Sequence, residues 1–517
     1  MSFLLEGDRT MRKLSVVLLK ASKYGPDGYV ERFGRGFMPN ATVPYINSLI
    51  PDSLGETAIH TATIDEYVQI NLDYLNMLDA RANGPTTALF VGVQSHQLHR
   101  ALDLAVYARD RGCMTVIGGP HAMTCDTSLL QGRGISFATS EAEMILTTIL
   151  ADAVQGELQP VYGNDQRWMR ELDPPVLKVP NAAEFEKHLT PLLGVYPARG
   201  CPYTCDFCSV IQIAGRNIRS QPVKTTIATL KAAQAAGVKW VMFTSDNFNK
   251  YSEAKALCEA IIEERLPLRY FIQCDTQIVK QPELIKLFAR AGVFEIFLGV
   301  ESLDRATLVK AHKAQNHPDT YRQIKEMCDE VGIDTHFSMI IGFPGDTHNG
   351  ILRQLDELKR INPSDASFYL LCPIPGTEQY KDFLAKGLIT EENLDRFDGT
   401  CPTWAHPNLS WPEWQELFRK CFRGFYSFKH AATFQPKGGI TRSEMWKRTA
   451  FAWWCTYNGQ HPMSGGLGRK RIDHVSDYIN LRRRTFGFDL APLPNCLQLS
   501  ESDAAFNRTA KLTTAAD

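Results

Sequence analysis

Three cysteines stand close together near the middle of the chain, in the segment Cys201-Pro-Tyr-Thr-Cys205-Asp-Phe-Cys208. Thiolates at this C-x3-C-x2-C spacing can hold three irons of a cubane cluster, because iron–sulfur clusters are normally bound by Cys. No fourth Cys follows nearby, so one iron would keep an open position, as a catalytic metal does. The alternatives are three unrelated thiols or a zinc loop. Zinc favours a fourth Cys or His at short spacing, and the next His lies far downstream.

The elements around these cysteines predict a partial barrel of parallel strands. Apolar runs alternate with helical patterns over ~190 residues, which is short of the ~250 residues of a full eight-fold barrel. The predicted strands are Gly194–Ala198, Trp240–Thr244, Tyr270–Cys274, Ile296–Val300, His336–Ile341 and Ala366–Leu371. The predicted helices are 222–236, 252–264, 282–291, 304–313, 318–331 and 348–360. The cysteines follow the first strand, and barrel chemistry sits in the loops at the carboxyl ends of strands.

The cysteine segment and the later loops together resemble radical S-adenosylmethionine (SAM) enzymes. Phe207 precedes the last Cys, as an aromatic residue does in the signature of that family. The other matching loops are Thr244-Ser245-Asp246-Asn247, Leu298-Gly-Val-Glu301-Ser302, Ile340-Ile-Gly342-Phe343-Pro-Gly345 and Pro373-Ile-Pro375-Gly376-Thr377. The first of them departs from the usual Gly-Gly-Glu, and each alone also fits a plain strand-to-helix turn. The resemblance covers roughly residues 10–400. It implies that Cys201, Cys205 and Cys208 bind the cluster, and that SAM contacts Phe207, Ser245, Asp246, Asn247, Glu301, Ser302, Gly342 and Phe343.

The first 160 residues alternate strand and helix patterns, which predicts a parallel sheet with helices on both faces. The strand candidates are Leu14–Leu19, Ala88–Val93 and Met114–Ile117. Residues 65–80 place Val68, Leu72, Leu75 and Leu78 on one face of a predicted helix, and a second helix is predicted over 101–111. Ligands of such sheets bind beyond the carboxyl ends of the strands.

This first domain resembles the Rossmann-like cobalamin-binding domain of the B12-dependent (class B) radical SAM enzymes. The resemblance rests on Val91-Gly-Val-Gln-Ser95, Gly118-Gly119-Pro-His121 and Ser140-Glu141-Ala-Glu143, and it implies cobalamin contacts at Ser95, Gly118, Gly119, His121 and Glu141. Glycines after a strand let a ligand approach the backbone. Gly118-Gly119 also fits a tight turn, and His121 a local hydrogen bond. The D-x-H-x-x-G motif that supplies a cobalt-binding His elsewhere is absent. His96 and His99 are candidate substitutes, although a His at a helix start is more often solvated.

The resemblance implies a methyltransferase that uses a [4Fe-4S] cluster, SAM and cobalamin (methylcobalamin) to methylate an unactivated carbon of a small molecule, such as a natural product or lipid. In that family an electron, expected from a flavodoxin or ferredoxin, starts the cleavage of SAM into a carbon radical. One alternative is a B12-dependent cyclase or rearrangement enzyme without methyl transfer. Another is a non-catalytic corrinoid- or cluster-binding protein, but a mere carrier needs no open iron.

The remaining cysteines exclude two other classes of radical SAM enzyme. A methylthiotransferase needs a second cluster in its N-terminal domain, which here holds only Cys113 and Cys125. Peptide-maturing members need many C-terminal cysteines. The region beyond the barrel has only four, widely spaced: Cys401, Cys421, Cys455 and Cys496.

Composition predicts an ordinary globular chain of several domains. Hydrophobic residues make up 44% and charged residues 22% of the 517 residues, and the net charge is −1, which disfavours nucleic acid as a partner. No apolar run approaches the ~18 residues of a membrane helix, and no signal peptide is recognised, so a cytoplasmic enzyme is expected. The predicted fold is α/β throughout the first two domains. The predicted parts are a Rossmann-like domain (1–160), a linker (161–193), a partial (β/α)6 barrel (194–390), a helical C-terminal cap (391–505) and a tail (506–517). Six of the eight tryptophans and two basic clusters, 469–471 and 482–484, lie in the cap.

Overall fold

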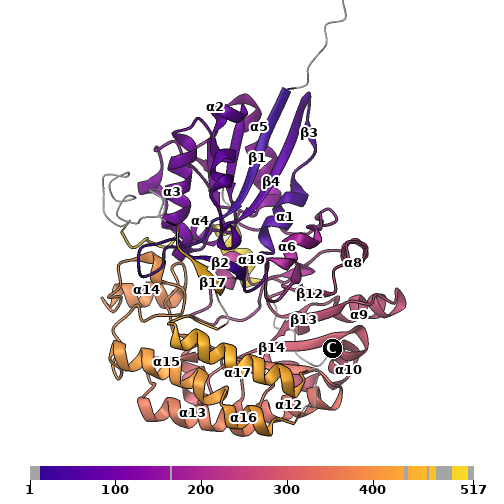
Figure 1. The fold of residues 1–517 in the computed structure, drawn as a ribbon, viewed down its shortest axis with the longest axis vertical. Helices are drawn as coiled ribbons and strands as arrows, with labels where there is room; N and C mark the ends of the chain where they lie inside the picture. Colours follow the sequence, from indigo (N-terminus) through magenta and orange to yellow (C-terminus); the bar gives the residue numbers. More distant parts are fainter. Residues whose placement is uncertain (1–11, 164–165, 436–439, 463–464, 473–491, 511–517) are drawn as a thin grey trace, which may run out of the picture.

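The computed structural model describes residues 12–163, 166–435, 440–462, 465–472 and 492–510. A sheet domain forms the top of the molecule in Figure 1, a second sheet with its helices lies beneath it, and the C-terminal helices cover the lower side. None of the described helices combines the length and apolar character that crossing a membrane would require. The predicted basic cluster at 482–484 lies outside the described residues.

The N-terminal domain is built on a seven-stranded sheet with the spatial order β3-β4-β1-β5-β6-β7-β8, in which only β3 runs antiparallel to its neighbour. Its strands are β1 (Arg12–Lys20), β3 (Ser53–Leu54), β4 (Thr57–Asp65), β5 (Thr86–Phe90), β6 (Met114–Gly118), β7 (Ser136–Ala138) and β8 (Val161–Tyr162). Its helices are α1 (Thr42–Leu49), α2 (Ala80–Asn83), α3 (Leu98–Arg109), α4 (Pro120–Thr124) and α5 (Ala142–Gln155). The strand order reverses between β1 and β5, and this switch point is where such sheets bind ligands.

The helix predicted over residues 65–80 is wrong. The strand β4 occupies Thr57–Asp65 and pairs with β1 along its whole length. Two short 3-10 turns follow it, η1 (Glu66–Val68) and η2 (Asp73–Leu78). At the start of this segment the Glu66 carboxylate is held by the buried Arg32 and Arg100, and these contacts from distant parts of the chain favour the short turns over one regular helix.

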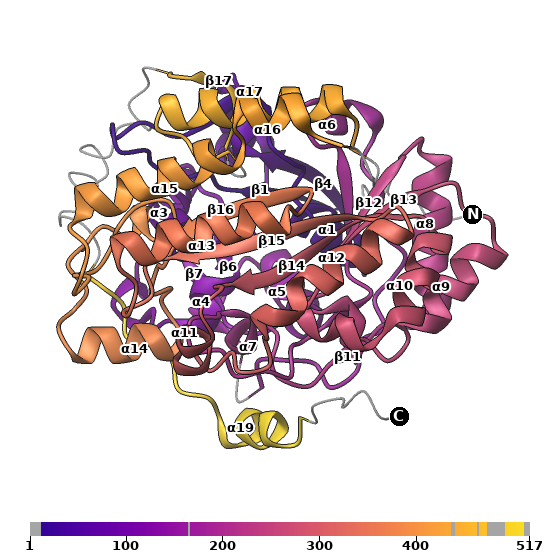
Figure 2. The same ribbon diagram turned by 90° about the horizontal axis from the view of Figure 1, so that it is seen from below.

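The second sheet confirms the predicted partial barrel, with six parallel strands in the order β16-β15-β14-β13-β12-β9. They are β9 (Leu192–Val195), β12 (Trp240–Phe243), β13 (Arg269–Cys274), β14 (Val293–Glu301), β15 (Asp334–Ile341) and β16 (Asp365–Leu370). The helices that follow them are α8 (Val223–Ala235), α9 (Ala254–Glu263), α10 (Pro282–Ala291), α11 (Arg305–Lys310), α12 (Tyr321–Glu330), α13 (His348–Ile361) and α14 (Glu378–Ala385), several of which are visible outside the strands in Figure 2. Short elements complete this part: α6 (Ala182–Glu186), the pair β10 (Ala198–Arg199) and β11 (Arg219–Ser220), and α7 (Val210–Ile213).

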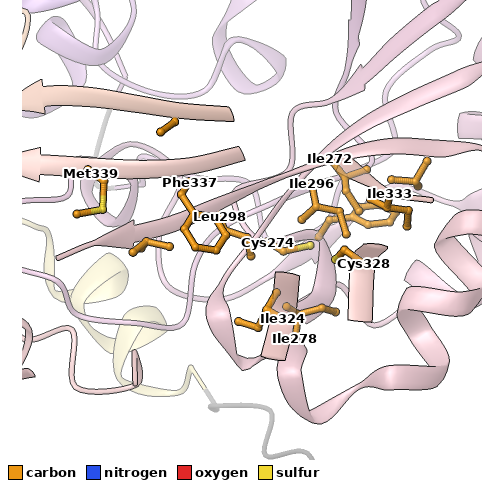
Figure 3. Close-up of a cluster of buried hydrophobic side chains, with 14 of the residues drawn as sticks. Ile272, Cys274, Ile278, Ile296, Leu298, Ile324, Cys328, Ile333, Phe337 and Met339 are labelled. Atoms are coloured by element: carbon orange, nitrogen blue, oxygen red, sulfur yellow. The ribbon is translucent and has the colours of Figure 1, made fainter. Parts of the chain in front are cut away.

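Alternate residues of the barrel strands have different environments. Figure 3 shows Phe337 and Met339 of β15 packed with strand neighbours in an apolar cluster that also includes Ile324 and Cys328 of α12. The residues between them along β15, such as Ser338, point to the other face of the sheet and line a cavity there. One face of the barrel sheet therefore packs into the apolar core, and the other face lines a cavity.

The C-terminal helices share a single apolar core with the barrel. They are α15 (Trp411–Phe425), α16 (Phe428–Thr433) and α17 (Arg442–Tyr457). Trp404 and Trp414 are buried in that core, whereas Trp446 and Trp454 are exposed. In the basic cluster 469–471, Arg469 pairs with Asp27 at 2.9 Å, beside the antiparallel pair β2 (Arg32–Gly36) and β17 (Gly466–Lys470).

The last described helix, α19, spans Glu501–Arg508. The tail predicted from residue 506 therefore begins inside a helix, and Asn507 is buried there. The polar residues of this segment predicted a frayed end. In the structure they form hydrogen bonds to the barrel instead. Of these, Asn507 Oδ1 accepts the backbone N–H of Arg216 at 2.8 Å.

Candidate functional site

The three clustered cysteines occupy the loop between β10 and α7, close to the carboxyl end of the first barrel strand. The N–H of Cys201 donates to the carbonyl of Gly215 at 3.1 Å, and that of Cys208 to the carbonyl of Cys205 at 3.3 Å. Burial raises the pKa of each thiol, and the neighbouring thiols raise the pKa of Cys201 and Cys208 further. The raised pKa values favour neutral thiols, and a bound cation would offset the repulsion among three thiolates in this loop.

Two amide side chains donate hydrogen bonds to sulfur atoms of the cysteine loop. Asn247 Nδ2 donates to Cys201 Sγ at 3.0 Å, and Gln315 Nε2 to Cys205 Sγ at 3.7 Å. Hydrogen bonds to the sulfurs are a recognised means of tuning such clusters.

Two of the predicted SAM-contacting residues in the loop after β12 stand beside the cysteines. Asp246 accepts the N–H of Gly200 at 2.9 Å, so it positions the start of the cysteine loop. Burial raises the pKa of Asp246. Ser245 is almost fully buried, and its hydroxyl has no hydrogen-bond partner within the described part of the chain. Ser245 lines none of the three cavities described below, whereas its neighbours Thr244 and Asp246 both line one of them.

Glu301 ends β14 at a register shift and has a left-handed backbone, with a φ of 65°. Such a conformation is strained for a residue other than Gly and is concentrated at functional sites. The Glu301 carboxylate is buried and pairs with Lys313 Nζ at 2.6 Å. The hydroxyl of Ser302 shares a hydrogen bond with Gln354 Oε1 at 3.0 Å. The Glu301 side chain lines a cavity. Ser302 is buried, and its hydroxyl is already engaged by Gln354.

Phe207 and Phe343 bring the cysteine loop and the end of β15 together. Their rings meet edge to face with centroids 5.8 Å apart, and Lys313 Nζ lies 5.8 Å from the Phe207 centroid. The N–H groups of Gly342 and Phe343 both donate to Asp346 Oδ2, at 2.9 and 3.0 Å. The backbone of this predicted SAM segment is thus already hydrogen-bonded within its own turn.

The Gly118-Gly119 segment follows β6, the neighbour of β5, and so lies one strand away from the switch point of the N-terminal sheet. A Cβ on Gly119 would come within 2.3 Å of the backbone N of Val93, so the glycine allows two loops to meet. Both glycines also line a cavity of about 470 Å³. Its walls include the aliphatic side chains Leu89, Val116, Ile145, Leu146 and Ile149, and this lining fits a planar heteroaromatic group such as the base of cobalamin.

The remaining predicted cobalamin contacts are engaged within the protein. His121 is buried, its Nδ1 is 3.0 Å from Ser95 Oγ, and burial lowers its pKa to about 3. Glu141 pairs with Arg219 at 2.6 Å and with Arg199 at 3.1 Å, so it ties the N-terminal domain to the cysteine-loop hairpin. Ser95 and Glu141 each still line a cavity.

The two candidate cobalt-binding histidines differ in their surroundings. His99 is buried against Asp395, with Nδ1 3.0 Å from Oδ1. His96 faces two cavities, and burial lowers its pKa to about 4, which keeps the imidazole neutral at pH 7.

Three cavities meet at Gln94, a residue that the sequence did not single out for a role. The first, of about 960 Å³, lies between the two sheets and the C-terminal helices. The second, of about 330 Å³, reaches from the cysteine loop to Glu301 and Tyr369. The third is the 470 Å³ cavity beside Gly118. Gln94 lines all three, and Lys20, at the end of β1, lines two of them. The only sequence feature that could have indicated Lys20 and Gln94 is their position. Lys20 ends β1 and Gln94 follows β5, the two strands on either side of the switch point.

Comparison with known proteins gives a consistent result. Residues 195–358 match the radical SAM superfamily. The chain is 24% identical to bacteriochlorophyllide d C-8(2)-methyltransferase of Chlorobaculum tepidum over 356 residues, which are 66% of this chain and 76% of that protein. It is 25% identical to the hopanoid C-2 methylase of Rhodopseudomonas palustris over 328 residues, which are 60% of this chain. That match spans 58% of the methylase, less than two thirds of its length.

Two solved structures share the fold over most of the chain. The radical SAM methyltransferase TsrM from Kitasatospora setae, solved with tryptophan substrate and a SAM analogue, matches with a TM-score of 0.58 and 14% identity. The match covers 96% of this chain and 99% of TsrM. The cobalamin-dependent SAM radical enzyme OxsB, solved with aqua-cobalamin and SAM, matches with a TM-score of 0.61 and 13% identity, over 86% of this chain and 72% of OxsB.

Proposed function

We propose that this chain is a B12-binding radical SAM enzyme that transfers a methyl group to a carbon atom of a polar small molecule; its match to the radical SAM superfamily and its likeness to a methyltransferase and to two cobalamin-containing structures support this. Its cofactors are a [4Fe-4S] cluster, SAM and cobalamin, which together supply hydrogen abstraction and the methyl group when bound. The single observation that supports the proposal most is the meeting of three cavities at Gln94, beside the cysteine loop.

The residues around the cysteine loop have distinct tasks in this proposal. Cys201, Cys205 and Cys208 hold three irons. The amides of Asn247 and Gln315 donate to two of the sulfurs and so offset thiolate charge in a buried site.

The three cavities can hold the three molecules that must meet, with cobalamin spanning two of the cavities. The cavity lined by Glu301 and Tyr369 suits SAM, because its wall also includes Ser209, which directly follows Cys208. The aliphatic cavity beside Gly118 suits the base of cobalamin. The cavity of about 960 Å³ suits the exposed face of cobalamin together with the substrate, because it shares Gln94 with both of the others and its wall includes Phe418 and Arg419 of α15.

The largest cavity favours a polar substrate over a hydrocarbon. Its wall includes Lys23, Glu31, Asp65, His96 and Asp398. Several of these groups are paired with one another: Lys23 Nζ contacts Asp398 and lies 3.7 Å from Glu31. A lipid chain laid along such a wall would desolvate charged groups without replacing their hydrogen bonds, which is costly.

Two other functions are less favoured. A cyclase or rearrangement enzyme would use the same cofactors, but the relatives named above are methyltransferases. A non-catalytic carrier would not need the strained backbone of Glu301 at the wall of a cavity.

The test is anaerobic purification with cobalamin supplied, followed by incubation with SAM and a strong reductant. We expect bound corrinoid, about four irons per chain as in a cubane cluster, and release of 5′-deoxyadenosine. Cys205→Ala should lose iron, and Gln94→Trp should keep iron but lose corrinoid. Gln155→Trp, at an exposed helix end, is the matched control and should keep both. A protein with a full cluster that neither binds corrinoid nor cleaves SAM contradicts the proposal.

A further inference from the structure

Two cysteines that are distant in sequence face each other across a short antiparallel contact. Cys125 follows helix α4 of the N-terminal domain, and Cys496 lies in the segment that leads to α19. The N–H of Asp126 donates to the carbonyl of Asn495 at 2.8 Å, and that of Leu497 to the carbonyl of Thr124 at 2.9 Å. These bonds flank the cysteines, so Cys125 and Cys496 form a non-hydrogen-bonded pair, the position at which opposite side chains are closest.

That position suits a disulfide. Opposite residues in such pairs have Cα atoms about 4.5 Å apart, which is inside the range of roughly 4.4–6.8 Å that disulfides adopt. Both thiols are free in this structure. We propose that Cys125 and Cys496 are a covalent modification site: they form a reversible disulfide that fastens the C-terminal segment to the N-terminal domain.

The segment that would be fastened, residues 492–510, is named here the C-terminal strap. It bridges two parts of the molecule. Near its start, the guanidinium of Arg167 donates to the carbonyl of Gln498 at 2.7 Å. In α19, the buried carboxylate of Asp503 accepts the N–H of Arg167 at 2.7 Å. Farther on, Asn507 accepts the N–H of Arg216, next to the cysteine loop of the candidate site. The yellow strap and α19 are visible at the lower edge of Figure 2.

The disulfide would therefore act at a structural junction. Cys125 ends α4, whose first turn follows the Gly118-Gly119 segment that lines the 470 Å³ cavity. The far end of the strap holds the residues that follow the cysteine loop, at Arg216 and Asn217. One covalent bond would connect a wall of the cavity to the strap, and the strap already contacts the chain beside the metal-binding loop.

The chemistry requires an oxidant, which we assign to a low-molecular-weight disulfide such as glutathione disulfide. Cys496 is partly exposed and Cys125 is fully buried, so Cys496 reacts first. Its thiolate attacks one sulfur of the oxidant, which forms a mixed disulfide and releases one glutathione. The Cys125 thiolate then attacks the Cys496 sulfur and releases the second. In total, the two cysteines lose two electrons and two protons. The electrons and the protons reduce one glutathione disulfide to two glutathione molecules.

The test uses the anaerobic holoenzyme, treated with glutathione disulfide, alkylated, digested with trypsin and analysed by mass spectrometry. The expected product links peptide 112–133, which contains Cys113 and Cys125, to peptide 485–508, which contains only Cys496. Dithiothreitol should remove the link. Cys113→Ser is the matched control, because it changes the other thiol of the same peptide and should retain the link. Cys125→Ser and Cys496→Ser should both abolish it.

The result that overturns the proposal is glutathione retained on Cys496 while Cys125 stays free for alkylation, in folded protein. A link that persists in Cys125→Ser also overturns it, because Cys113 would then be the partner. Cys496 is partly exposed, so its Ser variant is expected to fold even if the Cys125 variant does not. The readout is a peptide mass and not turnover, so it is independent of whether the enzyme methylates any substrate.

Discussion

The indole of Trp414 in α15 lies directly against Gly342 at the end of β15. Its Nε1 donates to the carbonyl of Ile341 at 3.1 Å, and a Cβ added to Gly342 would come within 2.2 Å of the ring. Gly342 also has a φ of 93°, in the left-handed region that favours Gly. The C-terminal helices are thus seated on a loop of the candidate SAM site, and they belong to the barrel core.

The first prediction concerns that contact. Gly342→Ala should lower the free energy of unfolding by about 2–4 kcal/mol, because it adds backbone strain and displaces the Trp414 ring. Gly345 lies in the same loop, but a Cβ added there would meet no atom within 4 Å. Gly345→Ala should therefore change the free energy of unfolding by less than about 0.5 kcal/mol. Denaturant titration of both variants measures the difference. If both variants lose the same free energy of unfolding, the Trp414 contact does not explain why position 342 needs Gly.

The second prediction concerns the hydrogen bond from Asn247 to Cys201. Asn247→Ala removes a donor that stabilises negative charge on the sulfur, so the reduced cluster should become less stable and its midpoint potential more negative. Gln315→Ala, which removes the longer bond to Cys205, should shift the potential less. Redox titration followed by electron paramagnetic resonance measures both, with iron content as the control. A potential that does not change in Asn247→Ala would contradict this role.

The third prediction concerns Glu66 and acid. Although its burial acts in the opposite direction, Arg100 and Arg32 lower the pKa of Glu66 to about 2, from an ordinary value of 4.5. The folded value lies below the unfolded value, so the stabilisation is complete above about pH 5 and is lost as the pH falls toward 2. Glu66→Gln should be much less stable than the natural protein at neutral pH, by about 3–5 kcal/mol, because two buried arginines lose their partner. The difference in free energy of unfolding between the natural protein and Glu66→Gln should become smaller as the pH is lowered from neutral to acidic, and denaturant titration at each pH measures it. A constant gap would contradict the assignment.

The fourth prediction separates two roles for Glu141. As an interdomain ion-pair residue, Glu141→Gln should cost about 3 kcal/mol, because it leaves the buried Arg219 without a carboxylate. Glu143→Gln should cost less, because its partner Arg199 keeps Glu141. Thermal unfolding compares the two variants, and corrinoid content after reconstitution shows whether Glu141 also contacts cobalamin. Loss of corrinoid with unchanged stability would favour the contact over the ion pair.

Some of these features were readable in the sequence, because they depend on near neighbours in the chain. The spacing of Cys201, Cys205 and Cys208 and the alternation of apolar runs with helices are local patterns. They predicted the metal-binding loop and six strands of a partial barrel, and the strands lie close to their predicted positions. The helix predicted over 65–80 failed where a long-range contact begins: the Glu66 carboxylate is held by Arg32 and Arg100, and two short 3-10 turns form in place of a regular helix.

The contacts that fill or form the site required the folded chain. Glu141 could be placed near the cofactors by resemblance, but its pairs with Arg199 and Arg219 join residues that are far apart in sequence. The meeting of three cavities at Gln94 and the Cys125–Cys496 pair likewise exist only because the two sheets and the C-terminal strap come together. Residue type and spacing specify which chemistry a chain can perform. The packing of distant segments decides which of those residues remain free to perform it.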